Sequence, residues 1–228
     1  MILLTLLIMA GAVACNPDFA PGATTTMTHF PQSPDEAIAE LVAGNARYVH
    51  GQTTATNPPS ARSALARGQA PFAAIIRCAD SRVAPEIVFD QPLGTLFVTA
   101  VAGNIVTPEI TASLEYSVAV LGSKLVVVMG HSGCGAVEAA IKYRDTADQL
   151  PGSLKILVDQ IKAPCTLKAD PTQSEKYIAE AVKCNASKGV GQLLARSQVL
   201  ADAVEMRQIK IIAGVQDVES GTFTVNMG

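Results

Sequence analysis

The chain has 228 residues, of which 49% are hydrophobic, enough for a sizeable buried core in one large domain or two small ones. Aromatic residues make up only 4% and tryptophan is absent, so packing depends on Ala, Val, Ile and Leu. The formal net charge is −3, and there is no run of five like charges, so the composition gives no electrostatic basis for binding nucleic acid.

Residues 1–15 are predicted to be a signal peptide or a lipoprotein leader. Residues 1–14 are apolar apart from one threonine, which suits the hydrophobic region of a signal peptide but is too short to span a bilayer comfortably. Small residues precede Cys15, as in a bacterial lipoprotein cleavage box, so Cys15 is a candidate lipid anchor. No Lys or Arg precedes the apolar run, which argues against a signal peptide, and a buried N-terminal helix is the alternative. We expect an exported protein, periplasmic or membrane-anchored.

Residues 16–32 are expected to form a linker, because this stretch is rich in Pro, Gly and Thr. The remaining residues, 33–228, are expected to form a single domain that opens with a helical arm. At Ser33 the sequence supplies a good N-cap, then a proline suited to the first helical position and a glutamate that completes a capping box. This helix is expected to reach about Val49, and a polar loop from Gly51 to Ser60 follows it.

Short apolar runs alternate with helical segments along the rest of the chain. Such runs predict strands buried on both faces, and the helices between them predict parallel crossovers. The sequence therefore predicts an α/β fold with a mainly parallel central β-sheet flanked by helices, and Thr222–Val225 as a C-terminal edge strand. The predicted strands are Phe72–Ile76, Leu96–Val101, Leu125–Met129 and Ile209–Val215, and the predicted helices are Pro85–Phe89, Thr107–Gly122, Ala136–Arg144 and about Val190–Met206.

Three soft metal ligands stand in two segments that are far apart in the sequence. Cys78 follows the first predicted strand, and His131 and Cys134 follow the third. Sites in open α/β sheets form at the carboxyl ends of strands, so the two segments can meet at one edge of the sheet. Two thiolates and one imidazole are a ligand set for catalytic zinc, which keeps a fourth position open and lowers the pKa of bound water toward ~7.

Each of these signals is weak alone, because Cys78 also suits a buried structural thiol and a Gly-rich turn can carry His131 and Cys134 for packing reasons. The combination is stronger, since both segments lie at strand ends and lead into helices. A closed structural zinc site would usually show a fourth Cys or His at short spacing, and the sequence has none near either segment. The sequence therefore favours an open metal site.

Asp80 and Arg82 follow Cys78 closely. An adjacent guanidinium lowers the pKa of a carboxyl group, so Arg82 would keep Asp80 ionised and able to orient water at the metal. A carboxylate released from Arg82 would instead reach the metal, so Asp80 is a candidate fourth ligand if the site is closed. The alternative without a functional role is an ordinary salt bridge at the start of a helix.

Two further cysteines, Cys165 and Cys184, lie outside the leader and the proposed metal site. In the oxidising compartment that export implies, we expect them to form a disulfide bond. Two unrelated thiols are the alternative.

Four motifs of this chain resemble those of one known family, the β-class carbonic anhydrases. The resemblance runs from about Ser33 to Ile141 and resumes more loosely from Ile209 to the end of the chain. The order and spacing of the two metal-ligand segments are highly specific. The motifs are Cys78-Ala79-Asp80-Ser81-Arg82-Val83, Val101-Ala102-Gly103-Asn104, Ser113-Leu114-Glu115-Tyr116 and Gly130-His131-Ser132-Gly133-Cys134-Gly135-Ala136-Val137.

The resemblance implies the residues of the active site and the partners of the chain. Zinc would be bound by Cys78, His131 and Cys134. Asp80 and Arg82 would form the catalytic dyad, and Gln91 resembles a family glutamine that hydrogen-bonds the substrate. The resemblance also implies a homodimer or a higher homo-oligomer, in which the N-terminal helices wrap around a partner.

Some positions depart from the family pattern. Many members have Arg at the position of Ala100 and some have Trp at that of Ile75, and these two side chains help to form an inhibitory bicarbonate site in part of the family. With both absent, we expect no such regulation. The segment from Leu150 to Gly189 departs most from the family and is expected to reshape the channel to the metal.

The activity that the resemblance implies is zinc-dependent reversible hydration of carbon dioxide to bicarbonate and a proton. A hydrolase of carbon disulfide or carbonyl sulfide is one alternative, since such enzymes share these motifs. A zinc-stabilised binding protein that has lost catalysis is the other, and the intact Asp80 and Arg82 argue against it.

Overall fold

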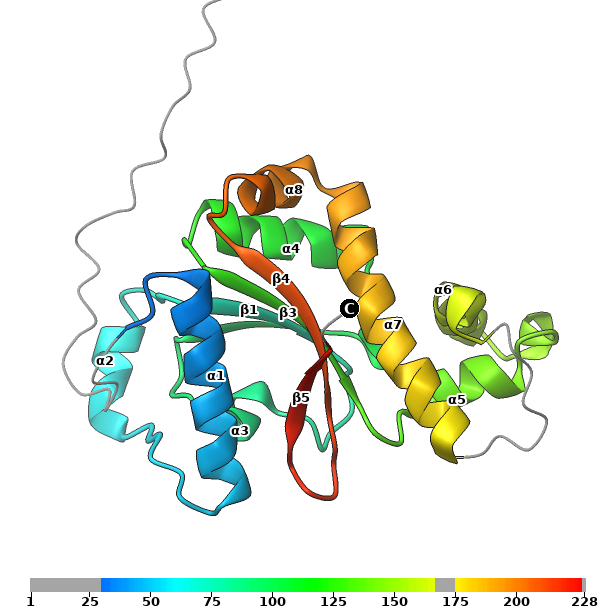
Figure 1. Cartoon of the computed structure of the whole chain (residues 1–228), viewed down its shortest axis with the longest axis horizontal. Helices are drawn as coiled ribbons and strands as arrows, with labels where there is room; N and C mark the ends of the chain where they lie inside the picture. The colour runs from blue at the N-terminus through cyan, green and yellow to red at the C-terminus, as the bar shows by residue number, and fades with distance from the viewer. Residues whose placement is uncertain (1–29, 167–174, 227–228) are drawn as a thin grey trace, which may run out of the picture.

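The computed structural model describes residues 30–166 and 175–226 (Figure 1). The predicted leader and most of the predicted linker lie outside these ranges, so export and a lipid anchor at Cys15 stay predictions. Among the helices within these ranges, none has the length and apolar character needed to cross a membrane.

The core of the molecule is a five-stranded sheet with the strand order β2-β1-β3-β4-β5. The first four strands in this order pair in parallel, and β5 pairs antiparallel to β4 at the edge. The predicted α/β fold with a C-terminal edge strand is therefore confirmed. The strands are β1 (Ala73–Arg77), β2 (Leu96–Ala100), β3 (Leu125–His131), β4 (Lys210–Gln216) and β5 (Phe223–Asn226).

Helices cover both faces of the sheet, and α1 and α7 lie on different sides of it in the view of Figure 1. The helices are α1 (Pro34–Val49), α2 (Arg62–Leu65), α3 (Pro85–Val88), α4 (Pro108–Ala119), α5 (Gly135–Lys142), α6 (Leu154–Cys165), α7 (Glu175–Arg196) and α8 (Gln198–Glu205), with short 3-10 turns η1 (Pro59–Ala61), η2 (Ala102–Asn104) and η3 (Ala147–Gln149).

Alternate residues of the central strands point to opposite faces, as the two-residue period of a strand requires. In β3, Val127 and Met129 pack with α1 and α3, whereas Val126 and Val128 pack with α4, α7 and α8. Every residue of β3 is buried. This burial explains why the central strands appear in the sequence as continuous apolar runs.

The N-terminal helix α1 begins as the sequence predicts. Ser33 is its N-cap and accepts a hydrogen bond from Glu36 N at 3.3 Å. Within the helix, the buried Asn45 donates to Val88 O at 3.0 Å and to Gly221 O at 2.9 Å. These bonds attach α1 to α3 and to the turn before β5, so the predicted helical arm packs on the sheet of its own chain.

The C-terminal helical region differs from the sequence prediction. The predicted helix from about Val190 to Met206 covers the end of α7, which begins at Glu175, and the whole of α8, and Ser197 separates the two helices. The Ser197 hydroxyl accepts a hydrogen bond from Leu200 N at 3.1 Å and therefore starts a new helix. A serine side chain competes in this way for backbone N–H groups, and this interrupts a helix at a position that apolar periodicity does not reveal.

Cys165 and Cys184 form a disulfide bond, with their Cα atoms 5.4 Å apart, and this confirms the pairing that the sequence predicts. The bond joins the last residue of α6 to the middle of α7. It therefore ties together two helices of the segment that departs most from the family pattern.

Removal of this disulfide by the double substitution C165A/C184A is expected to lower the free energy of unfolding by about 3 kcal/mol. The reason is that the unfolded chain regains the conformational entropy that the cross-link removes by closing a loop. The two cysteines are 19 residues apart in sequence, which sets the size of that loop. Urea unfolding of the oxidised protein and of the variant measures the difference. Equal midpoints would show that the bond does not contribute to stability.

Candidate metal centre

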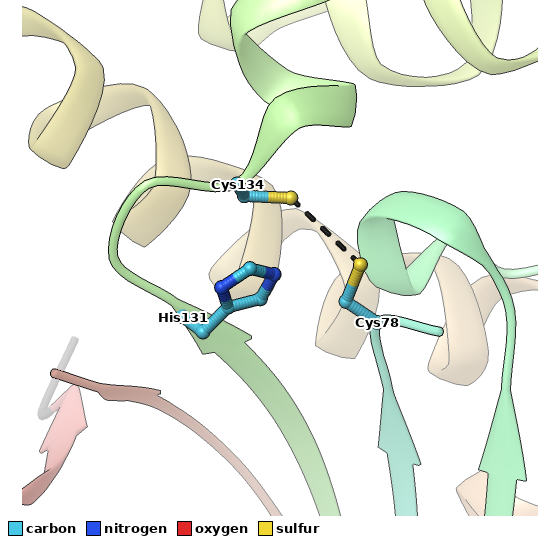
Figure 2. Close-up of side chains that lie close together, drawn as sticks. All are labelled: Cys78, His131 and Cys134. Atoms are coloured by element: carbon cyan, nitrogen blue, oxygen red, sulfur yellow. Dashed lines mark hydrogen bonds between the residues drawn. The ribbon is translucent and has the colours of Figure 1, made fainter. Parts of the chain in front are cut away.

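The three predicted ligands converge at the carboxyl ends of the neighbouring strands β1 and β3 (Figure 2). Cys78 follows β1 directly, His131 is the last residue of β3, and Cys134 is the N-cap of α5. Their ligand atoms all lie within 4.8 Å of one another, and the two Sγ atoms are 3.9 Å apart. All three side chains are buried.

The position of His131 corrects the predicted end of the third strand. The apolar run predicts an end at Met129, but pairing with β4 continues through Gly130 to His131, which lies opposite Gln216. His131 therefore projects from a rigid strand within the sheet. A ligand fixed in this way needs less reorganisation to bind a metal than one on a free loop.

The hydrogen bonding of the His131 ring leaves one of its nitrogens available to a metal ion. Its Nδ1 lies 3.0 Å from Ser132 O, and donation to this carbonyl leaves the lone pair on Nε2. Among the described residues, Nε2 is buried and has no hydrogen-bond partner. A buried nitrogen without a partner is costly, and a metal ion held by this imidazole and two thiolates would satisfy it. The residues present therefore fit a zinc ion.

The thiols of the cluster differ in their acidity. Hydrogen bonds from Cys134 and from Gly103 N hold the pKa of Cys78 at about 4, although burial opposes this shift. Cys134 donates its hydrogen bond to Cys78, so its own pKa is raised, and burial adds to the effect. Metal binding by both thiolates therefore requires release of the Cys134 proton.

Asp80 and Arg82 form a two-point ion pair beside the cluster. Asp80 Oδ1 accepts from Arg82 Nε at 2.9 Å and Oδ2 accepts from Nη2 at 2.8 Å. These hydrogen bonds hold the pKa of Asp80 well below its usual range. Asp80 Oδ2 also lies 3.8 Å from His131 Nε2, so the carboxylate borders the site and faces Arg82.

Arg82 also connects the two ligand segments. Its Nη2 donates to Gly133 O at 3.3 Å, in the turn between His131 and Cys134. Gly133 has a φ of 61°, a left-handed conformation that favours glycine, so the turn depends on this residue. The guanidinium thus sets the position of Asp80 and contacts the second ligand turn at the same time.

Gln91 contacts α1 and the residue that follows α3. Its side chain is buried, and its Nε2 donates to Glu40 Oε1 at 2.9 Å and to Phe89 O at 3.1 Å. A contact between Gln91 and substrate stays a prediction.

Two residues beside the site are not among the candidates that the sequence predicts. Gly103 N donates to Cys78 Sγ, and Asn185 Nδ2 donates to Gly103 O. Gly103 stands in one of the four family-like motifs, which could have marked it. Asn185 lies in the divergent segment, where no motif draws attention to it.

Comparison with known proteins identifies the family to which the chain belongs. The family model described as carbonic anhydrase matches residues 73–223. A carbonic anhydrase of Mycolicibacterium smegmatis is 34% identical over 194 residues, which cover 84% of this chain and 89% of that protein. The chain belongs to the carbonic anhydrase family. The β-class family and the enzyme that the sequence predicts are thereby confirmed.

Other members of the carbonic anhydrase family agree with this assignment. A carbonic anhydrase of Pseudomonas aeruginosa is 40% identical over 164 residues, covering 69% of this chain and 74% of that protein. A tetrameric β-carbonic anhydrase of Sordaria macrospora superposes with a TM-score of 0.67 at 24% identity, covering 85% of this chain and 96% of the other. The fold is therefore that of the β class of carbonic anhydrases.

Proposed function

We propose that the chain catalyses the reversible hydration of carbon dioxide to bicarbonate and a proton at a zinc ion bound by Cys78, His131 and Cys134. The convergence of these three ligand atoms within 4.8 Å, in a chain of this family, carries the proposal. Zinc in such a ligand set supplies a nucleophile near neutral pH, because it lowers the pKa of water from about 15.7 to about 7.

Asp80 and Arg82 would prepare the attack on carbon dioxide. Because Arg82 keeps Asp80 ionised, the carboxylate can accept a hydrogen bond from the attacking oxygen and direct its lone pair toward the carbon. Since Asp80 lies beside the ligand cluster and is engaged by Arg82, we assign it this orienting role in an open site, in preference to that of a fourth ligand.

The surroundings of the ligands suit a small apolar substrate. Cys78 and Cys134 belong to a buried cluster whose other members are aliphatic, including Ile105 and Val137. Such side chains exclude water from the surroundings of the ligands and favour an apolar substrate such as carbon dioxide. Asp80 and Arg82, in contrast, are partly exposed and can contact the charged product.

Stopped-flow assay of carbon dioxide hydration by the purified protein tests this function. Activity is expected to rise in proportion to bound zinc and to disappear with it when a chelator is added. Carbonyl sulfide and carbon disulfide serve as comparison substrates, and faster turnover of either would favour the hydrolase alternative. Folded, zinc-loaded protein that hydrates none of them would contradict the proposal and favour a binding protein.

We also propose that the protein is an exported homodimer or higher homo-oligomer. The structurally similar β-carbonic anhydrase of Sordaria macrospora is tetrameric, which supports self-association here. The apolar residues 1–14 and Cys15 support export and a lipid anchor. A monomeric mass by light scattering would contradict the first, and recovery of the cytosolic protein with Met1 retained would contradict the second.

A further inference from the structure

The backbone of Gly103, in η2, contacts the ligand cluster directly. Its N–H donates a hydrogen bond to Cys78 Sγ, with 3.2 Å between nitrogen and sulfur. Hydrogen bonds to a ligand orient it and stabilise its charge, so the position of Gly103 influences where the thiolate points. Gly103 has a φ of 72°, and a glycine rotates freely unless other groups hold it.

Two side chains from α6 and α7 hold Gly103 in place. Asn185 of α7 donates from Nδ2 to Gly103 O at 2.8 Å, and only 5% of Asn185 is exposed. Ile161 of α6 packs so closely that a Cβ atom at position 103 would lie 2.6 Å from its Cδ1. Gly103 is therefore bonded on its N–H side to the ligand and on its C=O side to Asn185, with Ile161 pressed against it.

Packing and a disulfide bond hold helix α7, which carries Asn185, in place. Its residues Ala181 and Val182 are buried in the same apolar cluster as Cys78 and Cys134. The neighbour of Asn185, Cys184, is joined to α6 by the disulfide. Helix α7, which carries Asn185, is thus packed against the ligand cluster and is linked to α6.

We propose that Asn185 is a positioning residue of the metal centre. Its amide fixes Gly103, and the Gly103 N–H in turn holds the Cys78 thiolate in the direction from which it binds metal. This inference rests on the proposed metal centre and extends it to a helix that carries none of the family motifs. Asn185 acts through Gly103 and does not bond to a ligand atom itself.

Asn185→Leu tests the proposal, because leucine has a similar size and cannot donate to Gly103 O. Zinc release from the loaded protein to a chromophoric chelator is expected to become about tenfold faster, the lower range for loss of an outer-shell partner. In cobalt-substituted protein, the thiolate-to-cobalt absorption band is expected to shift, since it reports the geometry at sulfur. Asn185→Ser, too short to reach Gly103 O, gives the same readouts if the leucine variant does not fold.

Asn45→Leu is the matched control. Asn45 is also 5% exposed and also donates to backbone carbonyls, but its partners lie at α3 and before β5. This variant is expected to unfold more easily while its zinc release and cobalt spectrum stay those of the wild type. Wild-type release and spectrum in the Asn185 variants, or equal changes in Asn45→Leu, would overturn the proposal. Failure of the wild-type protein to bind zinc would overturn the proposed function itself, before any variant is compared.

Discussion

Cys134→Ser is expected to remove bound zinc and carbon dioxide hydration together. The buried cluster offers two sulfurs and one imidazole nitrogen, and the substitution leaves one thiolate and one imidazole at the site. A serine hydroxyl is neutral at working pH and is a poor zinc ligand compared with a thiolate. Metal analysis of the purified variant and stopped-flow hydration measure the two losses. No hydration above the uncatalysed background is expected.

The disulfide variant C165A/C184A provides the control for this substitution. It removes two cysteines, one more than Cys134→Ser, but keeps all three proposed ligands, so one zinc per chain is expected to remain. Circular dichroism confirms that each variant is folded before metal is measured. Full zinc content and full activity in Cys134→Ser would reject the site.

The clustering of the three candidate ligands can be predicted from the sequence because these residues lie at strand ends. Cys78 and His131 are distant in the chain, but β1 and β3 are parallel neighbours, so their carboxyl ends meet. Consecutive valines in the sequence indicate that β3 is a buried strand. These are strong local patterns, and the fold that follows from them needs few further assumptions.

The contacts that surround the ligand cluster cannot be predicted from the sequence in the same way. Asn185 and Gly103 are 82 residues apart, and a single hydrogen bond between them leaves no periodic pattern in the sequence. The break at Ser197 depends on one hydroxyl, and the extension of β3 to His131 depends on pairing with β4. Contacts of this kind are decided by tertiary structure, which local propensity does not contain.

Asp80→Asn is expected to lower kcat/KM for carbon dioxide by about 100-fold, the range for loss of a positioned acid–base group, while zinc content is unchanged. Asparagine keeps the size of the side chain but removes the charge that the Arg82 hydrogen bonds stabilise. Because those bonds hold the pKa of Asp80 well below its usual range, the wild-type carboxylate is ionised throughout the neutral range. The substitution is therefore expected to lower the rate at every neutral pH, because the Asp80 carboxyl group does not titrate in this range.

The matched control is Asp145→Asn, in a second Arg–Asp pair of the same chain. Asp145 Oδ2 accepts from Arg144 Nη2 at 2.8 Å, the same distance as in the Asp80 pair, but Asp145 is exposed and lies after α5. This variant is expected to keep wild-type kcat/KM. An equal loss in both variants would mean that the effect of Asp80→Asn comes from general charge and not from the site.

The double variant D80N/R82Q separates the roles within the pair. If Arg82 acts only by orienting the Asp80 carboxylate, replacing Arg82 should not lower kcat/KM further once the carboxylate is gone. The double variant should then have about the same kcat/KM as Asp80→Asn alone. Losses that multiply would mean that Arg82 acts on substrate or product independently, through the half of its side chain that is exposed. Zinc content again serves as the check, because Arg82 also donates to Gly133 O in the turn that carries Cys134. A double variant that loses zinc would show that this contact, rather than the carboxylate, is the main contribution of the guanidinium.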